Sequence, residues 1–274
     1  MAVVLITGCG SGIGCALASA LAQREHVVVA TLRSPDKAPA ALKVLAGEQS
    51  HRFLLAPLDV TDAAMRRQAI DLTLTRFGRL DVLINNAGIT ATGSVEDTPE
   101  TIWRRIFETN FFGPLELIRL ALPIMRRQRA GRLINVTSVA ALITTPLLAA
   151  YTASKHALDA LSASLDIEAR SFGVRTTNIM PGPFKTGLPG KALDVAVSPP
   201  YAAITERFKA VFGELEQHAR EDLSPVIEAA LAAINDPEPQ LRYPVGTEPI
   251  AVLPAILQAL GPLRQFGLHI TGQD

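Results

Sequence analysis

The sequence has few cysteines and no excess of charge of either sign. Its 274 residues contain only two cysteines, Cys9 and Cys15, which lie close together near the N-terminus. A disulfide framework or a zinc site needs further partners, so we expect neither, and a reducing, cytoplasmic environment fits the pattern. Lys and Arg number 26, as do Asp and Glu, which gives a formal net charge of +0. We therefore expect no nucleic-acid partner.

Long apolar segments are also missing. The chain passes from Met1 directly into the apolar run 2–6, with no charged leader followed by a cleavable segment, so no signal peptide is predicted. The longest late apolar stretch, residues 250–260, is interrupted by Pro254. That stretch is well short of the roughly 20 residues needed to span a bilayer. We expect no transmembrane segment, although 250–260 would still be able to touch a membrane surface.

Apolar runs alternate with helical patterns for about the first 180 residues, with no internal repeat or linker. The expected strands are 3–6, 26–32, 52–58, 81–84, 132–137, 174–180 and 240–245. The expected helices are 15–23 (directly after Gly14), 35–46, 62–77, 99–129 (kinked or divided at Pro114), 150–172, 201–220 and 224–235. This order predicts one α/β domain over 1–274, a doubly wound Rossmann fold with about seven parallel strands covered on both faces. The Pro- and Gly-rich segment 183–223 breaks the rhythm and is expected to be a substrate loop or lid.

A glycine-rich turn joins the first strand to the first helix. Its residues are Thr7, Gly8, Gly10, Ser11, Gly12, Ile13 and Gly14. The literal G-x-G-x-x-G spacing fails, because Ile13 stands where its last glycine would be. The pattern Thr-Gly-x-x-x-Gly-x-Gly still allows close approach of a pyrophosphate to a helix N-terminus. Alone it would fit any glycine-rich turn, but its place between strand and helix favours a dinucleotide site.

The end of the second strand bears on the choice of dinucleotide. About 20 residues beyond such a turn, a carboxylate usually binds the ribose of NAD, whereas an Arg accommodates the 2′-phosphate of NADP. Here the positions are Leu32 and Arg33, which favours NADP(H). The alternative is a solvated surface Arg33. Ser34 and Lys37 would either assist the phosphate or belong to the next helix.

Three side chains point to proton transfer. Tyr151 and Lys155 are four residues apart in a helical pattern and share a face. A neighbouring ammonium favours phenolate, so Tyr151 would exchange a proton with a carbonyl or an alcohol. Ser138, after the fifth strand, would hold the substrate oxygen. Each residue alone is commonplace, but together with the glycine turn they indicate an oxidoreductase.

These motifs resemble the short-chain dehydrogenase/reductase family. The matching residues are Thr7, Gly8, Gly12, Ile13, Gly14, Asp59, Val60, Asn85–Gly88, Asn110, Ser138, Tyr151, Lys155, Pro181, Gly182 and Thr186, over about residues 2–190. Within the family, Ile6–Cys9, Ala30–Arg33 and Pro237–Tyr243 are similar to a subgroup that contains 17β-hydroxysteroid dehydrogenase type 1 and photoreceptor retinol dehydrogenases. The far C-terminus is shorter than in the longer relatives.

The resemblance, and not the spacing, implies further roles. Asp59 and Val60 would hold the adenine, Asn86, Ala87 and Gly88 would lie beneath the adenosine ribose, and Lys155 would bind the nicotinamide ribose. Pro181, Gly182 and Thr186 would contact the nicotinamide end, and Asn110 would hold a helix bend and a proton-relaying water. Relatives commonly pair through helices matching 100–129 and 150–172, so a homodimer or homotetramer is expected.

The expected activity is NADP(H)-dependent interconversion of a small apolar secondary alcohol and a ketone. An apolar substrate is suggested by Leu142, Ile143, Leu147, Phe184, Leu188, Leu193, Val195, Val197, Phe208 and Phe212, unless they are ordinary core. A ketoacyl-type reductase, an epimerase or dehydratase relative, and a non-catalytic NADP-binding sensor remain alternatives. We expect His156 and Cys9 to pack rather than react, and His218 either to touch a polar substrate end or to be solvated.

Overall fold

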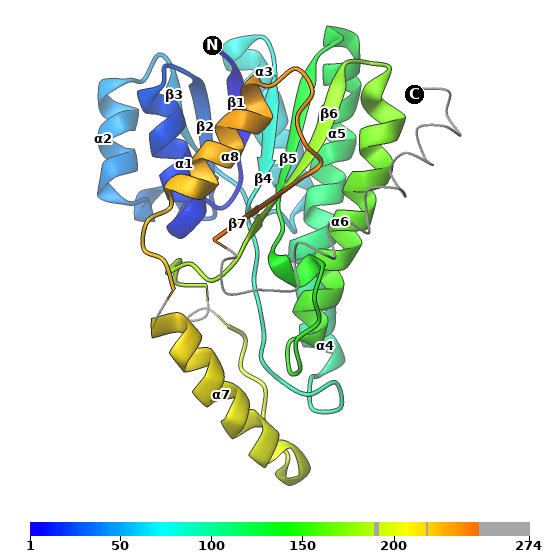
Figure 1. Ribbon diagram of the computed structural model, residues 1–274. Coiled ribbons are helices and arrows are strands. Elements are labelled where there is room, and N and C mark those ends of the chain that lie inside the picture. The colour runs from blue at the N-terminus through cyan, green and yellow to red at the C-terminus, as the bar shows by residue number, and fades with distance from the viewer. Residues whose placement is uncertain (189–191, 218, 247–274) are drawn as a thin grey trace.

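A single sheet of seven parallel strands forms the centre of the molecule. The computed structural model describes residues 1–188, 192–217 and 219–246. The strands are β1 Val3–Ile6, β2 Val27–Leu32, β3 Phe53–Pro57, β4 Val82–Asn85, β5 Gly131–Val136, β6 Val174–Pro181 and β7 Arg242–Val245. Their order is β3-β2-β1-β4-β5-β6-β7 (Figure 1). The order reverses between β1 and β4, where doubly wound sheets bind their ligands. The predicted fold class is confirmed.

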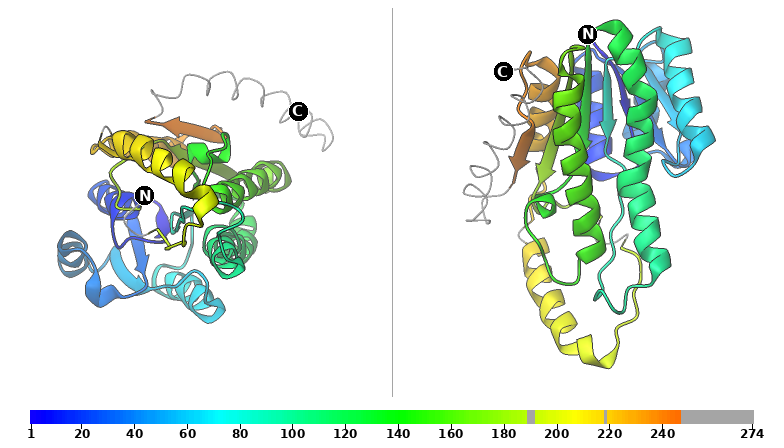
Figure 2. Two further views of the ribbon diagram at one scale, coloured as in Figure 1. Left: turned by 90° about the horizontal axis from the view of Figure 1, so that it is seen from below. Right: turned by 90° about the vertical axis from the view of Figure 1, so that its right-hand side faces the viewer.

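Helices cover both faces of the sheet (Figures 1 and 2). One layer holds α1 Gly12–Gln23, α2 Ala40–Glu48 and α8 Ser224–Asn235, and the other holds α3 Ala63–Phe77, α5 Gly113–Gln128 and α6 Ala149–Arg170. Alternate residues of β1 enter the two cores, since Val4 and Ile6 pack with the first layer and Leu5 with the second. Strands buried on both faces are apolar throughout, which explains the continuous runs in the sequence.

Two predicted helices are divided. The expected helix 35–46 is a 3-10 turn, η1 Pro35–Lys37, followed by α2, because Pro39 takes an extended conformation between them. The expected helix 99–129 consists of α4 Glu100–Phe107, a π turn η2 Glu108–Phe112, and α5. The prediction placed the division at Pro114, which instead lies inside the first turn of α5. Proline lacks the N–H that would bond the carbonyl four residues earlier in an α-helix. The chain widens into the π turn directly before Pro114.

The segment after β6 projects beyond the carboxyl ends of the strands. Its helix α7, Ala202–Gln217, lies away from the sheet and below it in Figure 1, preceded by the 3-10 turn η5 Pro199–Tyr201. The segment is tied at its base, where Lys185 N donates to the carbonyl of Arg220 at 2.9 Å. It is tied again where Leu193 N donates to Thr90 O at 2.8 Å. His218 and the 250–260 stretch lie outside the described residues.

The glycine turn packs tightly against the loop after β4. A Cβ on Gly14 would lie 2.4 Å from Asn86 Nδ2 and 2.5 Å from Gly8 O, and one on Gly8, whose φ is +74°, would lie 2.8 Å from Ala87 Cα. Gly10, in the same turn, has nothing within 4 Å of the corresponding position. The turn therefore requires glycine at two of these positions because of close approach.

We predict that Gly14→Ala lowers the free energy of unfolding by roughly 1–3 kcal/mol, because the new methyl group must displace Asn86 or the backbone of Gly8. Thermal or urea unfolding measures the change. The matched control is Gly10→Ala, which should stay within about 0.5 kcal/mol of the starting protein. Equal losses in the two variants would contradict the packing described.

Candidate active site

Reciprocal hydrogen bonds join the glycine turn to the residues after β4. Thr7 Oγ1 accepts from Asn86 N at 2.9 Å and from Ala87 N at 3.0 Å. Asn86 Nδ2 donates to Thr7 O at 2.8 Å and to Gly8 O at 3.2 Å. The structure thus brings these predicted residues together at the reversal point of the sheet, and Asn86 braces the turn.

The segment after β6 reaches the same turn from the other side. A Cβ on Gly12 would lie 2.8 Å from Thr186 O. Pro181 ends β6, and Gly182 N donates to the carbonyl of Val245 in β7 at 2.8 Å. Gly12 was predicted to lie at the pyrophosphate and Thr186 at the nicotinamide end of a dinucleotide. In the structure the two residues are neighbours. Ser11, at the N-cap of α1, precedes Gly12 and Ile13 in the first helical turn.

The carboxyl ends of β2 and β3 carry one cation and one carboxylate. Leu32 is buried and pairs in register with Pro57, and the next residue, Arg33, is exposed. Burial raises the pKa of Asp59, but hydrogen bonds from Thr61 and the charges of Arg33 and Arg105 outweigh it, so the pKa is lowered overall. The guanidinium of Arg33 is thus close enough to Asp59 to lower the pKa of its carboxyl. Val60 is buried against Gly113 at the start of α5.

The hydroxyl of Ser34 does not cap the 3-10 turn after β2. Ser34 precedes η1 and makes no side-chain cap hydrogen bond, while Lys37 is exposed. We expected Ser34 either to assist the phosphate or to cap the next helix. Its hydroxyl forms no such cap.

Tyr151 and Lys155 lie in the first turns of α6, facing the end of β5. Lys155 is only 4% exposed, and its Nζ donates to Val136 O at 3.0 Å. The same Nζ is 5.7 Å from the ring centroid of Tyr151. Ser138 follows β5, accepts from Ala140 N at 3.1 Å, and makes a hydrogen bond with Tyr151. The three residues predicted for proton transfer are therefore brought together.

Burial dominates the titration of both groups on α6. It raises the pKa of Tyr151, and the hydrogen bond from Ser138 lowers it only in part. Burial also lowers the pKa of Lys155 to about 8. The expectation that Lys155, aided by the charge of an oxidised nicotinamide, brings the phenol closer to neutral pH stays a prediction. At pH 7 the lysine is still mainly protonated and can act as the cation of the site.

Asn110 lies in the π turn η2 and ties three elements together. Its Nδ2 donates to Ile89 O at 2.9 Å and its Oδ1 accepts from Ile89 N at 2.9 Å. Nδ2 also donates to Ser154 Oγ at 3.0 Å, and Ser154 Oγ donates to Tyr151 O at 2.7 Å. The sequence analysis missed Ile89 and Ser154. Only the position of Ser154, three residues after Tyr151 on the same helix, hints at its part.

A nicotinamide dinucleotide fits the residues at this edge. Gly88 leaves space beside the ammonium, since a Cβ there would lie 3.6 Å from Lys155 Nζ and 3.4 Å from Asn110 Oδ1. The glycine turn opens directly into the N-terminus of α1, where backbone N–H groups attract phosphate. The edge therefore offers a phosphate site and, beyond Gly88, a buried cation.

The other candidate side chains have structural partners. His156 Nδ1 is 3.0 Å from Thr152 O, and its ring is half-buried. Cys9 is fully buried, its Sγ donates to Ile6 O at 3.5 Å, and burial raises its pKa. Among the described residues, no group of three or more His, Cys, Asp or Glu side chains is placed to hold a metal ion. Within that same part of the chain, no helix is long and apolar enough to cross a membrane.

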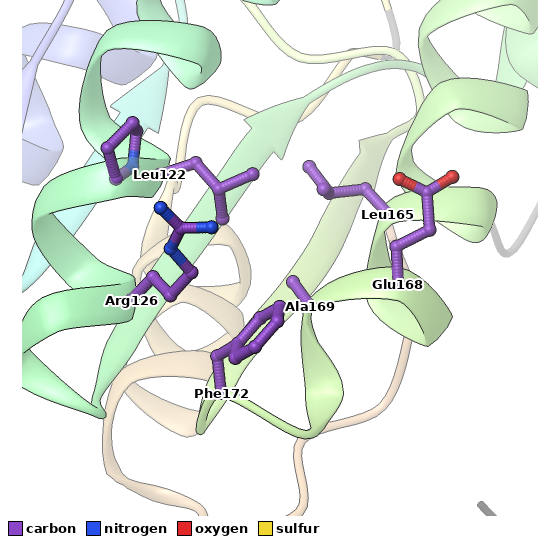
Figure 3. A pocket seen from close by; sticks show the side chains of 7 residues that line it. Leu122, Arg126, Leu165, Glu168, Ala169 and Phe172 are labelled. Carbon is purple, nitrogen blue, oxygen red and sulfur yellow. The ribbon is translucent and has the colours of Figure 1, made fainter.

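A groove elsewhere on the surface is separate from these residues. It lies between α5 and α6 and is lined by Leu122, Pro123, Arg126, Leu165, Glu168, Ala169 and Phe172 (Figure 3). The guanidinium of Arg126 lies 5.8 Å from the ring centroid of Phe172. Neither Tyr151 nor Lys155 lines this groove.

Comparisons with known proteins agree with this geometry. A family model described as short chain dehydrogenase matches residues 2–194. An uncharacterized oxidoreductase of Bacillus subtilis is 34% identical over 250 residues, with 89% of each chain covered. Retinol dehydrogenase 8 of Bos taurus is 37% identical over 195 residues, covering 70% of this chain and 62% of the relative.

A solved structure gives the same result for the fold. The crystal structure of a short-chain dehydrogenase from Streptomyces avermitilis is 32% identical in sequence, with a TM-score of 0.83. The match covers 100% of this chain and 98% of the Streptomyces chain. The matched segment 2–194 contains the glycine turn, Ser138, Tyr151 and Lys155. This chain therefore belongs to the short-chain dehydrogenase family of nicotinamide-dependent oxidoreductases.

Proposed function

We propose that the protein is an NADP(H)-dependent oxidoreductase that interconverts an apolar secondary alcohol and a ketone. The observation that carries the proposal is the junction of Ser138, Tyr151 and Lys155 at the end of β5. The family membership supports the reaction class, and the exposed Arg33 at the end of β2 supports NADP(H) over NAD(H).

The bound nicotinamide supplies or accepts the hydride, and the protein supplies orientation and one proton. The residues that would hold the dinucleotide are Thr7, Gly8, Gly10, Ser11, Gly12, Ile13, Gly14, Leu32, Arg33, Asp59, Val60, Asn86, Ala87, Gly88, Tyr151, Lys155, Pro181, Gly182 and Thr186. In reduction, the phenol of Tyr151 donates its proton to the carbonyl oxygen, which Ser138 holds by a hydrogen bond. In oxidation, the phenolate takes the proton from the alcohol.

Lys155 assists Tyr151 through its charge. Because burial raises the pKa of Tyr151, phenolate forms only if positive charge is close by. The ammonium of Lys155, 5.7 Å from the ring centroid, is such a charge. Asn110 positions the pair through Ser154, which donates to Tyr151 O. At neutral pH Tyr151 is therefore held as the phenol, the form that donates a proton.

Segment 183–223 would cover an apolar substrate, but fewer residues than expected remain for it. Phe184 is buried in the core beside Gly246, and Leu193 and Val195 pack against Ala91 and its neighbours. The half-buried residues that remain include Leu142, Ile143, Phe208 and Phe212. The rings of Phe208 and Phe212 stack on α7 with centroids 4.6 Å apart. These four side chains would contact an apolar substrate.

We also propose that the protein forms a homodimer through α5 and α6. The groove in Figure 3 is lined by the half-buried Leu122 and Phe172 above the buried Leu165, with the exposed Arg126 and Glu168 of opposite charge beside them. A two-fold axis over this face would bury the apolar side chains and allow each Arg126 to approach Glu168 of the second copy.

Replacing Tyr151 by Phe should abolish turnover, because the proton donor is lost while the ring still fills its site. Loss of NADPH absorbance with a panel of hydrophobic ketones measures turnover, and isothermal titration measures NADPH binding, which should be largely retained. Turnover at the original rate would overturn the proposed mechanism. Intact binding together with no turnover in the unaltered protein would favour a non-catalytic sensor.

The 2′-phosphate role of Arg33 is tested separately. Arg33→Ala should weaken NADPH binding by at least about tenfold, since a charge-assisted hydrogen bond is worth roughly 1.5–3 kcal/mol. NADH lacks the phosphate, so its dissociation constant should change little. Equal losses for the two dinucleotides would contradict the assignment.

Sedimentation velocity of the full chain should give the mass of two or four copies. Leu122→Glu should shift it toward one copy, because a carboxylate in the apolar groove would be desolvated on association. The control is Leu72→Glu, at an exposed position on α3, which should leave the mass unchanged. A single-copy mass for the unaltered protein would rule out this interface.

A further inference from the structure

A row of polar side chains crosses the sheet face that packs against α6. Asn85, Asn135, Asn178 and Arg242 pair in register across β4, β5, β6 and β7. Asn85 Nδ2 donates to Asn135 Oδ1 at 2.9 Å. The row ends in an ion pair with α6, in which Arg242 Nε and Nη2 donate to the two oxygens of Asp159 at 2.9 Å and 2.8 Å.

The ion pair is largely shielded from water. The side chain of Asp159 is 10% exposed and that of Arg242 is 15% exposed. Asn178 Nδ2 also donates to Asp159 Oδ1, at 2.7 Å. A carboxylate in such surroundings depends on its partners, because unpaired buried charge is costly and acts over longer distances than at a surface.

Asp159 lies on the reactive face of α6. Tyr151, Lys155 and Asp159 follow one another at intervals of four residues, so they line one face of the helix. Each interval is a rise of about 6 Å. The carboxylate is therefore about one helical turn from Lys155 and two from Tyr151 along the axis of α6.

On the basis of the proposed function, we infer that Arg242 is a positioning residue for the proton-transfer pair. Its two hydrogen bonds to Asp159 balance the charge of that carboxylate and hold α6 against β7. The carboxylate then has little effect on the pKa values of Lys155 and Tyr151. Arg242 is not among the residues that would touch the substrate or the dinucleotide. It acts through Asp159.

Several other charged groups around α6 have hydrogen-bond or ion-pair partners other than Asp159. Those on the elements that pack against it are Glu100, Arg104 and Arg105 on α4, Glu108 on η2, Glu116, Arg119, Arg126 and Arg127 on α5, Arg132 on β5 and Arg175 on β6, with His156, Asp166, Glu168 and Arg170 on α6 itself. Glu100 pairs with Arg104, Glu116 with Arg119, and Arg170 and Arg175 with Glu238. Asp166 accepts from Thr176 N and Arg132 donates to Asp236 O. Within the described part of the chain, Arg242 is the cation that pairs with Asp159.

The sign of the effect differs between the two partners. Removing Arg242 leaves a net negative charge at Asp159, which favours the protonated forms of Lys155 and Tyr151 and raises both pKa values. Removing the carboxylate leaves the positive charge of Arg242, which lowers both. A purely mechanical role would not make the two substitutions act in opposite directions.

The test compares Arg242→Met, Asp159→Asn, Arg242→Lys and the double variant Arg242→Met/Asp159→Asn in the full chain with NADP⁺. The ultraviolet difference spectrum of phenolate is titrated with pH, using Tyr151→Phe as the background. Arg242→Met should raise the apparent pKa of Tyr151 and Asp159→Asn should lower it, each by at least roughly 0.5 pH unit. The double variant and Arg242→Lys should lie close to the unaltered protein.

Shifts of the Tyr151 pKa in the same direction in Arg242→Met and Asp159→Asn, or no shift in either of these two variants, would overturn the inference. If Arg242→Met does not fold, as judged by circular dichroism, Asp159→Asn and Arg242→Lys still decide between the outcomes. The phenolate titration needs no turnover, so the proposed function can fail independently. The pH dependence of kcat/KM for a hydrophobic secondary alcohol should move by the same amounts where the alcohol is oxidised.

Discussion

A buried ammonium needs an acceptor, and in this protein the carbonyl at the end of β5 provides it. Lys155 Nζ donates to Val136 O, which fixes the first turns of α6 against the carboxyl edge of the sheet. Ser138 lies two residues beyond that carbonyl, so the same contact determines where Ser138 and Tyr151 meet. Burial lowers the pKa of Lys155, but only to about 8, so the lysine remains mainly a cation at neutral pH.

The dinucleotide half of the site depends on close backbone approach rather than on charge. Asn86 donates to two carbonyls of the glycine turn, and Gly8 and Gly14 leave no room for a side chain between the turn and the loop after β4. Thr186 closes the turn from the other side. Two loops from distant parts of the sequence are thereby held where the strand order reverses, which is where the carboxyl ends of β1 and β4 leave space for a ligand.

The strands were predictable, and the candidate reactive residues could be named, because each leaves a local signal. Strands covered on both faces are continuous apolar runs, and Tyr151 and Lys155 show their common face through their spacing alone. The π turn at Glu108–Phe112 has no comparable signal, and the nearby Pro114 directed the prediction to the wrong residue. Phe184 looked like a substrate contact, but it fills the core beside Gly246.

Contacts that depend on strand register were out of reach of the sequence. Asn135 and Asn178 become neighbours only through the pairing of β5 with β6, and Asp159 meets Arg242 across 83 residues of chain. A one-residue change of register would place these side chains on the opposite face. The sequence therefore predicts candidates for the reacting residues, while the structure determines what surrounds them.

The central claim is that this site transfers a hydride and Tyr151 supplies the proton. Its most direct test is a single-turnover reaction of the full chain with an apolar ketone and NADPH in which both hydrogens at the reactive nicotinamide carbon are deuterium, with the product alcohol examined by mass spectrometry. One deuterium is expected at the carbinol carbon of the product. Reduction of the ketone without deuterium at that carbon, although the deuterated NADPH is bound, would contradict it.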